Sequence, residues 1–237
     1  MMLRIVTIAI LLTATLTAGA FEVRVAALEG DVRVRRGVEE RWQPAARDLR
    51  LKEIDTILTG ERGSVTLLLE DGRTFELGPN AILDIADLRR IDTRELFLFL
   101  MRDKVRRIAV PAGSGSLNIT NVSVVHGSRN TDEGNASSDS DGEIDPDWIR
   151  EKNGALALYE QDFHPNAVMR LHTILNRYES ESGCGELYVW MGRAFEALED
   201  SGQAIGAYRH ALEPGLGCPE GPWQQAAREA LERLLDG

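Results

Sequence analysis

The sequence has few of the residues that usually build a catalytic or metal site. Only two cysteines and four histidines occur among 237 residues, and the histidines are too scattered to form a ligand set. His126-Gly127-Ser128 brings a histidine near a serine, but without a strained nucleophile turn or an oxyanion loop. Gly113-Ser114-Gly115 precedes a predicted strand instead of a helix, which excludes a phosphate-binding loop. We therefore expect no catalytic residue, no metal site, no cofactor and no enzymatic activity.

Long hydrophobic runs are also lacking. The uncharged, mostly apolar run at 5–16 has 12 residues, whereas a membrane-spanning helix needs roughly 20. Arg4 before this run and Ala18-Gly19-Ala20 after it are typical of an export signal that is cleaved before Phe21. Residues 1–20 are thus predicted to be a signal peptide. The alternative is an uncleaved anchor, which would be the only predicted contact with a membrane.

Charge divides the remaining chain into two parts. Residues 21–128 carry 17 basic and 17 acidic residues, whereas residues 129–237 carry 9 basic and 21 acidic residues, within a total net charge of −11. An acidic half of this size repels phosphate backbones, so a nucleic-acid partner is not expected.

The neutral part shows the period of two that is typical of β-strands, with turn residues every eight to twelve positions. Asp71-Gly72 predicts a hairpin with a type I′ turn. Apolar residues alternate with Arg24, Arg33 and Arg35, and this arginine face is either solvated or ligand-facing. The predicted strands are residues 23–28, 31–35, 54–58, 65–69, 74–77, 82–85, 95–101, 105–110, 117–120 and 122–125.

The motifs of this part resemble those of the FecR domain, a periplasmic β-rich module. The resemblance rests on Asp55-Thr56-Ile57-Leu58-Thr59-Gly60, on the Asp71-Gly72 hairpin, on an opening hairpin at 28–34 and on a closing strand that ends at Ser128. It implies an all-β FecR-like domain over residues 21–128 and a periplasmic location.

A change of composition marks the end of this domain. Residues 129–147 are rich in Ser, Asn, Gly and Asp, with too little apolar content to offset the entropy of ordering, which predicts an acidic flexible linker. Asp139, Asp141 and Glu143 alternate as in a calcium loop, but Gly142 is misplaced and the bidentate glutamate is missing. A solvated linker is the favoured interpretation.

Residues 148–237 switch to the helical period of about 3.6. Tyr188-x-x-Met191-Gly192-x-x-Phe195 followed by Ala204-x-x-x-Tyr208-x-x-Ala211 is similar to the tetratricopeptide repeat, with a weaker copy before it and a closing helix at 223–235. This resemblance implies an all-α domain of TPR-like helical hairpins; an ordinary helical bundle is the alternative. The predicted apolar faces are Leu156, Tyr159 and Phe163; Ala167, Leu171, Ile174 and Tyr178; Leu187, Trp190, Met191, Ala194, Phe195 and Leu198; and Ala204, Ile205, Tyr208, Ala211 and Leu212.

The two cysteines, Cys184 and Cys218, are 34 residues apart, which is one repeat length. Each precedes a helix, so repeats would bring them to the same end of the array, and export to an oxidising compartment favours a disulfide between them. Free thiols and a metal pair are the alternatives, and the sequence offers no further ligands beside them.

These features favour an exported, non-enzymatic adaptor of the cell envelope whose acidic repeats dock a partner protein. Tyr159, Trp190 and Tyr208 are candidate groove residues, with a role in the repeat core as the alternative. A second hypothesis, from the FecR resemblance, is an envelope signalling regulator, although only Met1 to Arg4 precede the apolar run. A third is a protein that binds or hydrolyses cell-wall glycan or peptide, which would need paired carboxylates in a cleft.

Overall fold

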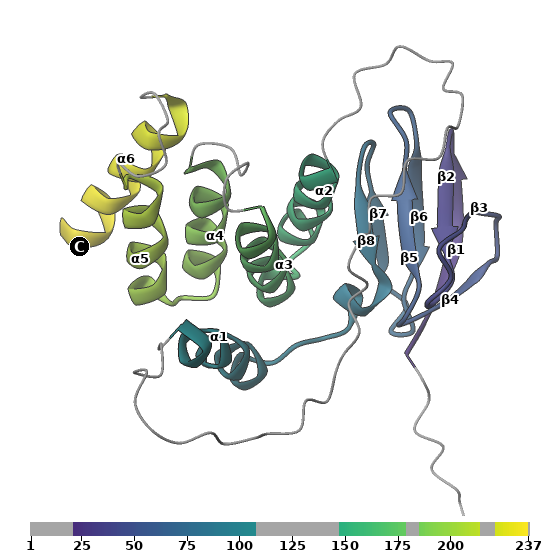
Figure 1. Ribbon diagram of the computed structural model, residues 1–237, viewed down its shortest axis with the longest axis horizontal. Helices are drawn as coiled ribbons and strands as arrows, with labels where there is room; N and C mark the ends of the chain where they lie inside the picture. Colours follow the sequence, from purple (N-terminus) through teal and green to yellow (C-terminus); the bar gives the residue numbers. More distant parts are fainter. Residues whose placement is uncertain (1–20, 108–146, 179–184, 214–220, 237) are drawn as a thin grey trace, which may run out of the picture. The chain divides into compact units, whose positions relative to one another are not determined.

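The computed structural model describes residues 21–107, 147–178, 185–213 and 221–236. Within these ranges, a region of two antiparallel β-sheets is followed by a helical region (Figure 1). The chain divides into two compact units, with the boundary between Arg89 and Arg90. The predicted order of a β region and then an α region is confirmed. The predicted signal peptide, the strands expected at 117–120 and 122–125, and the linker up to residue 146 lie outside the described residues.

The strands of the first unit are β1 (Glu22–Glu29), β2 (Val32–Arg35), β3 (Trp42–Pro44), β4 (Arg50–Lys52), β5 (Thr56–Thr59), β6 (Ser64–Leu68), β7 (Thr74–Leu77) and β8 (Ile82–Asp84), and a short 3₁₀ helix, η1 (Ile85–Leu88), follows. One sheet has the order β4-β1-β6-β7 and the other β3-β2-β5-β8, with antiparallel pairs throughout. The sequence predicted all of these strands except β3 and β4, which are only three residues long and lack a readable period.

Alternate residues of the longer strands are buried, as a period of two requires. In β1, Val23 is buried, whereas Arg24 is exposed and lies 3.8 Å from Asp48. Arg33 in β2 likewise lies 2.9 Å from Asp31 in a half-exposed ion pair. These contacts favour the solvated interpretation for Arg24 and Arg33.

The predicted hairpin joins β6 to β7, but its turn is of a different type. The Leu69 N–H donates to the Arg73 carbonyl oxygen at 2.9 Å, which leaves a three-residue loop. Only Gly72 in this loop has a positive φ, 84°, whereas a type I′ turn needs positive φ at both central residues. The Asp71 carboxylate accepts a hydrogen bond from the Arg73 N–H at 3.0 Å and so stabilises the longer loop.

Two glycines allow the chain to pass between the sheets twice at one place. The β1–β2 and β5–β6 turns each leave one sheet and enter the other. A Cβ on Gly30 would lie 2.1 Å from the Arg62 carbonyl oxygen, and a Cβ on Gly63 would lie 2.3 Å from that of Asp31. The Gly60 N–H also donates to the Asp31 carbonyl oxygen at 2.8 Å. The two turns therefore touch through their backbones, which excludes side chains at both positions.

A helix, α1 (Thr93–Arg107), occupies the segment where strands were predicted at 95–101 and 105–110, so that prediction was wrong over the described residues. Apolar residues fill 96–101 without a gap, and such a run has neither the strand period nor the helical one. The Asp92 carboxylate accepts a hydrogen bond from the Glu95 N–H at 2.7 Å and caps the helix. Leu, Met, Arg and Lys, which dominate the segment, are also strong helix formers.

The second unit contains α1 and a row of five helices: α2 (Asp147–Glu160), α3 (His164–Arg177), α4 (Glu186–Ala197), α5 (Ser201–Ala211) and α6 (Pro222–Asp236). From α2 onward each helix packs on the next one, and α2, α4 and α6 also contact one another in turn. This places α2, α4 and α6 along one side of the row (Figure 1). α1 packs on α3 and buries Leu96.

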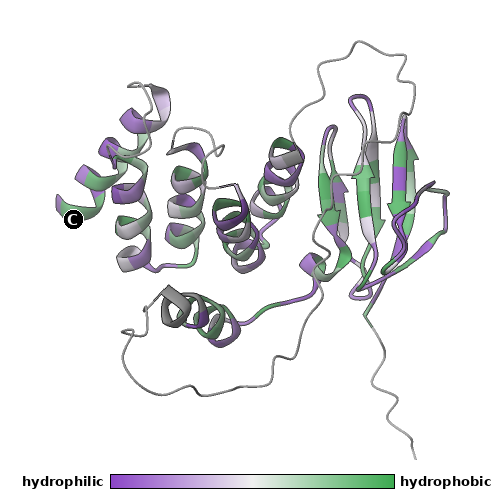
Figure 2. Ribbon diagram, in the orientation of Figure 1, coloured by the Kyte–Doolittle hydropathy of each residue, from purple (hydrophilic) through white to green (hydrophobic). Residues whose placement is uncertain are grey.

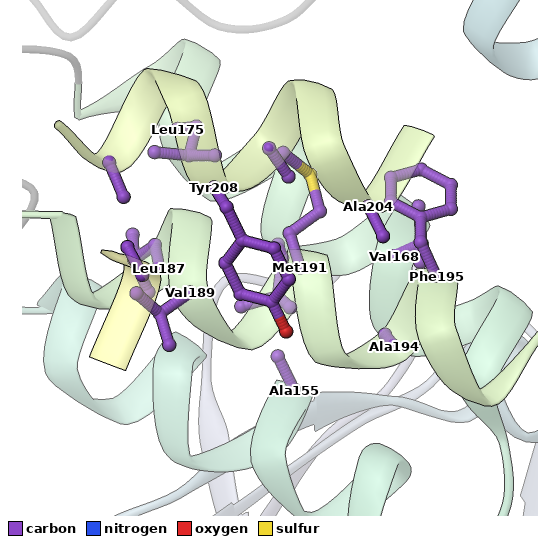
Figure 3. Close-up of a cluster of buried hydrophobic side chains, with 14 of the residues drawn as sticks. Ala155, Val168, Leu175, Leu187, Val189, Met191, Ala194, Phe195, Ala204 and Tyr208 are labelled. Carbon is purple, nitrogen blue, oxygen red and sulfur yellow. The ribbon is translucent and has the colours of Figure 1, made fainter. Parts of the chain in front are cut away.

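An apolar core runs through this unit (Figure 3). Ala155, Ala194 and Ala204 are fully buried, and these small side chains let neighbouring helices approach closely. The helices mix apolar and polar residues in the way expected of amphipathic helices (Figure 2). Within the described residues, no helix has the length and apolar character needed to cross a bilayer.

Candidate partner-binding face

Three half-buried aromatic side chains form a row across α2, α4 and α6. The centroid of the Tyr159 ring on α2 lies 5.4 Å from that of Trp190 on α4, with an interplanar angle of 65°. The Trp190 centroid lies 6.1 Å from that of Trp223 on α6. Both distances fall in the range in which aromatic pairs attract each other. We call Tyr159, Trp190 and Trp223 the aromatic row.

Burial of the neighbouring residues holds the aromatic row at the rim of the core. Leu158, Val189 and Gln224 each adjoin a row residue in sequence, and none of them is more than 8% exposed. An ion pair of 3.0 Å between Lys152 and Glu186 ties α2 to α4 beside them. The row rings are therefore partly packed on the core and partly in contact with solvent.

Polar groups flank the aromatic row. The Arg193 guanidinium lies 4.6 Å from the centre of the Trp190 ring, and the His164 ring lies 5.3 Å from that of Tyr159. Trp190 Nε1 and His164 Nδ1 are buried and have no hydrogen-bond partner among the described residues. Such atoms are rare, because most buried polar atoms in proteins form a hydrogen bond. The row thus combines apolar ring surface with a nearby cation, as protein-binding surfaces do.

Tyr208, which the sequence placed in the same groove, is not part of the row. Its side chain is only 1% exposed, and its ring lies among the buried side chains of Figure 3. Its hydroxyl donates to Glu196 Oε1 at 2.5 Å. Burial of the hydroxyl is the main cause that raises the pKa of Tyr208, and the hydrogen bond to Glu196 raises this pKa further. The groove assignment of Tyr208 was therefore wrong, and the core role that was its alternative is correct.

The sequence spacing distinguishes these aromatic residues in retrospect. Tyr159, Trp190 and Trp223 recur at nearly equal intervals of 31 and 33 residues. Trp223 was assigned only to a closing helix and was missed as a member of the row. Tyr208 follows Trp190 by only 18 residues and lies on α5, the helix after that of Trp190.

Two carboxylates of the helical unit, on Glu151 and Glu196, form bonds to neighbouring helices. Glu151 on α2 is 6% exposed and forms an ion pair with Arg177 on α3. Glu196 on α4 accepts hydrogen bonds of 2.5 Å from Tyr208 on α5 and from Arg233 on α6. Burial acts to raise the pKa of Glu196, but the bonds from Arg233 and Tyr208 outweigh it and hold this pKa below its usual value.

Much of the negative charge of residues 129–237 lies outside the described helices. Of its 21 acidic residues, 12 lie in the described stretches, together with 8 basic residues. The other nine acidic residues lie in 129–146, 179–184 and 214–220. The described helical surface is therefore only mildly acidic, and the strongest negative charge belongs to the segment before α2.

The other candidate site residues of the sequence are the histidines, the cysteines and the acidic residues of the calcium-like spacing. No three His, Cys, Asp or Glu side chains of this part of the chain are grouped so that they could hold a metal ion. His172 and His210 each contact an aromatic ring. Cys184 and Cys218, with their predicted disulfide, lie outside the described residues, as do His126 and the calcium-loop residues.

Comparisons of the chain with models of known protein families, with curated proteins and with solved structures find no match.

Proposed function

We propose that this protein is an exported, non-enzymatic binding protein of the cell envelope, in which the helical unit docks a partner protein. The aromatic row is the observation that carries the proposal. Tyr and Trp are the residues most enriched in the energetic centres of protein interfaces, where their large rings are desolvated by the partner. Three such rings on α2, α4 and α6 provide a continuous contact surface for a peptide or a helix.

The packing of the helices supports TPR-like repeats as the framework of this surface. We assign the two repeats to the helix pairs α2–α3 and α4–α5, and the closing helix to α6. Gly192 on α4 faces the Tyr208 ring of α5 so closely that a Cβ would lie 2.6 Å from Tyr208 Cε1. A small residue opposite a large one is the pairing on which the tetratricopeptide resemblance rests.

The β unit is the second binding surface of the proposal, with a FecR-like fold. Its most characteristic motif begins at Asp55, whose side chain is 3% exposed. The Asp55 carboxylate accepts hydrogen bonds from Arg36 Nη1 at 2.8 Å, from the Gly37 N–H at 3.0 Å and from the Lys52 N–H at 2.9 Å. These bonds give the first residue of the motif a structural role in the β unit.

The proposed partner is basic, because this protein carries a net negative charge. The excess of acidic residues in the chain would attract a basic partner over a long range, and this attraction falls as salt shortens the screening length from about 10 Å at 0.1 M to about 3 Å at 1 M. The rings would supply the short-range contact, which salt affects little.

A pull-down from envelope extract tests this proposal. The bait is the chain from residue 21 to 237, compared with the double variant Tyr159→Ser/Trp223→Ser and with a control variant, Gln203→Ser/Arg209→Ser, on the exposed side of α5. We expect the wild type and the control to retain the same protein and the row variant to lose it. Retention of the same protein by the row variant, or by the β unit alone, would rule out docking through the helices.

A further inference from the structure

The outer side of α1 carries an exposed apolar stripe that nothing in the aromatic row uses. Phe97 and Leu98 are both 57% exposed and Met101 is 41% exposed. Position 101 is four residues from 97 and three from 98, so its side chain neighbours both of them on the helix surface and the three form one stripe. Leu96, on the opposite side of α1, is 4% exposed and belongs to the core of the second unit. The helix is therefore apolar on two faces, of which only one is packed.

Basic residues accompany the stripe. α1 contains four arginines and one lysine against two acidic residues, although residues 129–237 are strongly acidic. Arg94 and Arg102 are exposed and lie one turn before Phe97 and one turn after Leu98, respectively. The Arg102 guanidinium also lies 5.5 Å from the centre of the Phe99 ring. Exposed apolar side chains are thus bracketed by cations along one helix.

We propose that α1 binds the protein to the surface of a membrane that contains anionic lipids. Helices that lie in the lipid interface bury large apolar side chains just below the headgroups while cations beside them contact lipid phosphates. Phe97, Leu98 and Met101 are the inserted side chains of this proposal, and Arg94 and Arg102 are the phosphate contacts. The charge of α1 matches an anionic surface and not a basic one.

The form of the stripe favours a lipid surface over a protein partner. Its three side chains come from two successive turns of one helix, so they project from a convex surface. A protein partner would need a matching groove, whereas lipid chains adapt to any outline. This site is independent of the aromatic row, since the row lies on α2, α4 and α6 and the stripe on α1.

Vesicle flotation tests the proposal. The chain from residue 21 to 237 is used in every arm, so residues 1–20 cannot cause binding, and vesicles of phosphatidylcholine alone are compared with vesicles that also contain phosphatidylglycerol. We expect binding to the anionic vesicles only. The triple variant Phe97→Gln/Leu98→Gln/Met101→Gln should reduce the partition coefficient by about tenfold or more, and each of Arg94→Gln and Arg102→Gln by about fivefold.

Two controls keep the result interpretable. Leu235→Gln removes a 60% exposed apolar side chain from α6 and should leave vesicle binding unchanged. Circular dichroism and thermal unfolding must show that the triple variant is folded; if it is not, the two single arginine variants decide. Equal binding to both kinds of vesicle, no binding to either, or undiminished binding of the variants would overturn the proposal. Self-association that the triple variant abolishes, without vesicle binding, would assign the stripe to a second copy of the chain instead.

Discussion

Replacement of Gly192 by alanine is the most direct test of how the helical hairpins are packed. An added Cβ would lie 2.6 Å from Tyr208 Cε1, 2.7 Å from Cζ and 2.9 Å from Cδ1. Real Cβ atoms are essentially never found so close to another heavy atom, so either the ring or helix α4 must move. The ring cannot move outward freely, because it is 1% exposed and its hydroxyl is bonded to Glu196.

Three effects determine the magnitude. Overpacking of a core costs about 1–3 kcal/mol, and displacement of the ring weakens a hydrogen bond to a charged group that contributes about 1.5–3 kcal/mol. Alanine in place of glycine favours the helix by about 1 kcal/mol. Steric and hydrogen-bond losses therefore win, and we expect Gly192→Ala to destabilise the helical unit by about 2–4 kcal/mol.

Urea unfolding followed by the helical circular dichroism signal measures this change. Gly206→Ala on α5 is the matched control, because a Cβ there meets nothing within 4 Å, and it should stabilise the unit by up to about 1 kcal/mol. In a Tyr208→Ala background, Gly192→Ala should cost little, since the clashing ring is gone. Equal stability of Gly192→Ala and Gly206→Ala would contradict the close contact between Gly192 on α4 and the Tyr208 ring on α5.

Three further predictions concern charges. Asp55→Asn should destabilise the β unit by about 2–4 kcal/mol, because it removes the buried partner of Arg36, whereas Glu53→Gln, in an exposed pair, should change stability by less than about 0.5 kcal/mol in the same urea titration. The pKa of Glu196 in the folded state lies below its ordinary value of 4.5. The ionised carboxylate therefore stabilises the fold above pH 4.5, and this stabilisation is lost as the pH falls from 4.5 through the folded-state pKa. Unfolding free energies measured against pH should therefore fall less steeply below pH 4.5 in Glu196→Gln than in the parent, and equal slopes would contradict this. Replacement of the six acidic residues of 129–146 by their amides should flatten the salt dependence of partner binding but preserve binding at high salt, and an unchanged salt dependence would show that the charge is not used for steering.

The sequence predicted the parts of the fold in which one periodicity extends over several residues. Val23 and Arg24 show the strand period, and the faces of α3 and α4 show the helical one, so both regions were placed correctly. The run at 96–101 shows neither, and it was assigned to a strand, whereas it forms a helix whose first turn is capped by Asp92. The turn at Asp71-Gly72 was misjudged because one side-chain hydrogen bond favours a longer loop.

Two of the three residues of the aromatic row were proposed from the sequence. Tyr159 and Trp190 were placed in one groove, and their rings are 5.4 Å apart. Helical period alone cannot distinguish Tyr208 from them, because residues of both helices in a hairpin contribute to the core. The contact of Tyr208 with Gly192 can be predicted only if the distance between α4 and α5 is known. The position of Trp223 in the row can be predicted only if the contact of α4 with α6 is known. Both depend on packing between helices.

Site-specific photocrosslinking tests most directly whether the aromatic row docks a partner. A photoreactive phenylalanine analogue replaces Trp223 in the row and, in a separate protein, Gln203 on the exposed side of α5. After irradiation in envelope extract, mass spectrometry identifies what each position has captured. We expect one dominant protein to be crosslinked from position 223, to be absent from position 203 and to be lost when Tyr159 is replaced by serine. Equal labelling from both positions, or no protein captured from position 223, would contradict it.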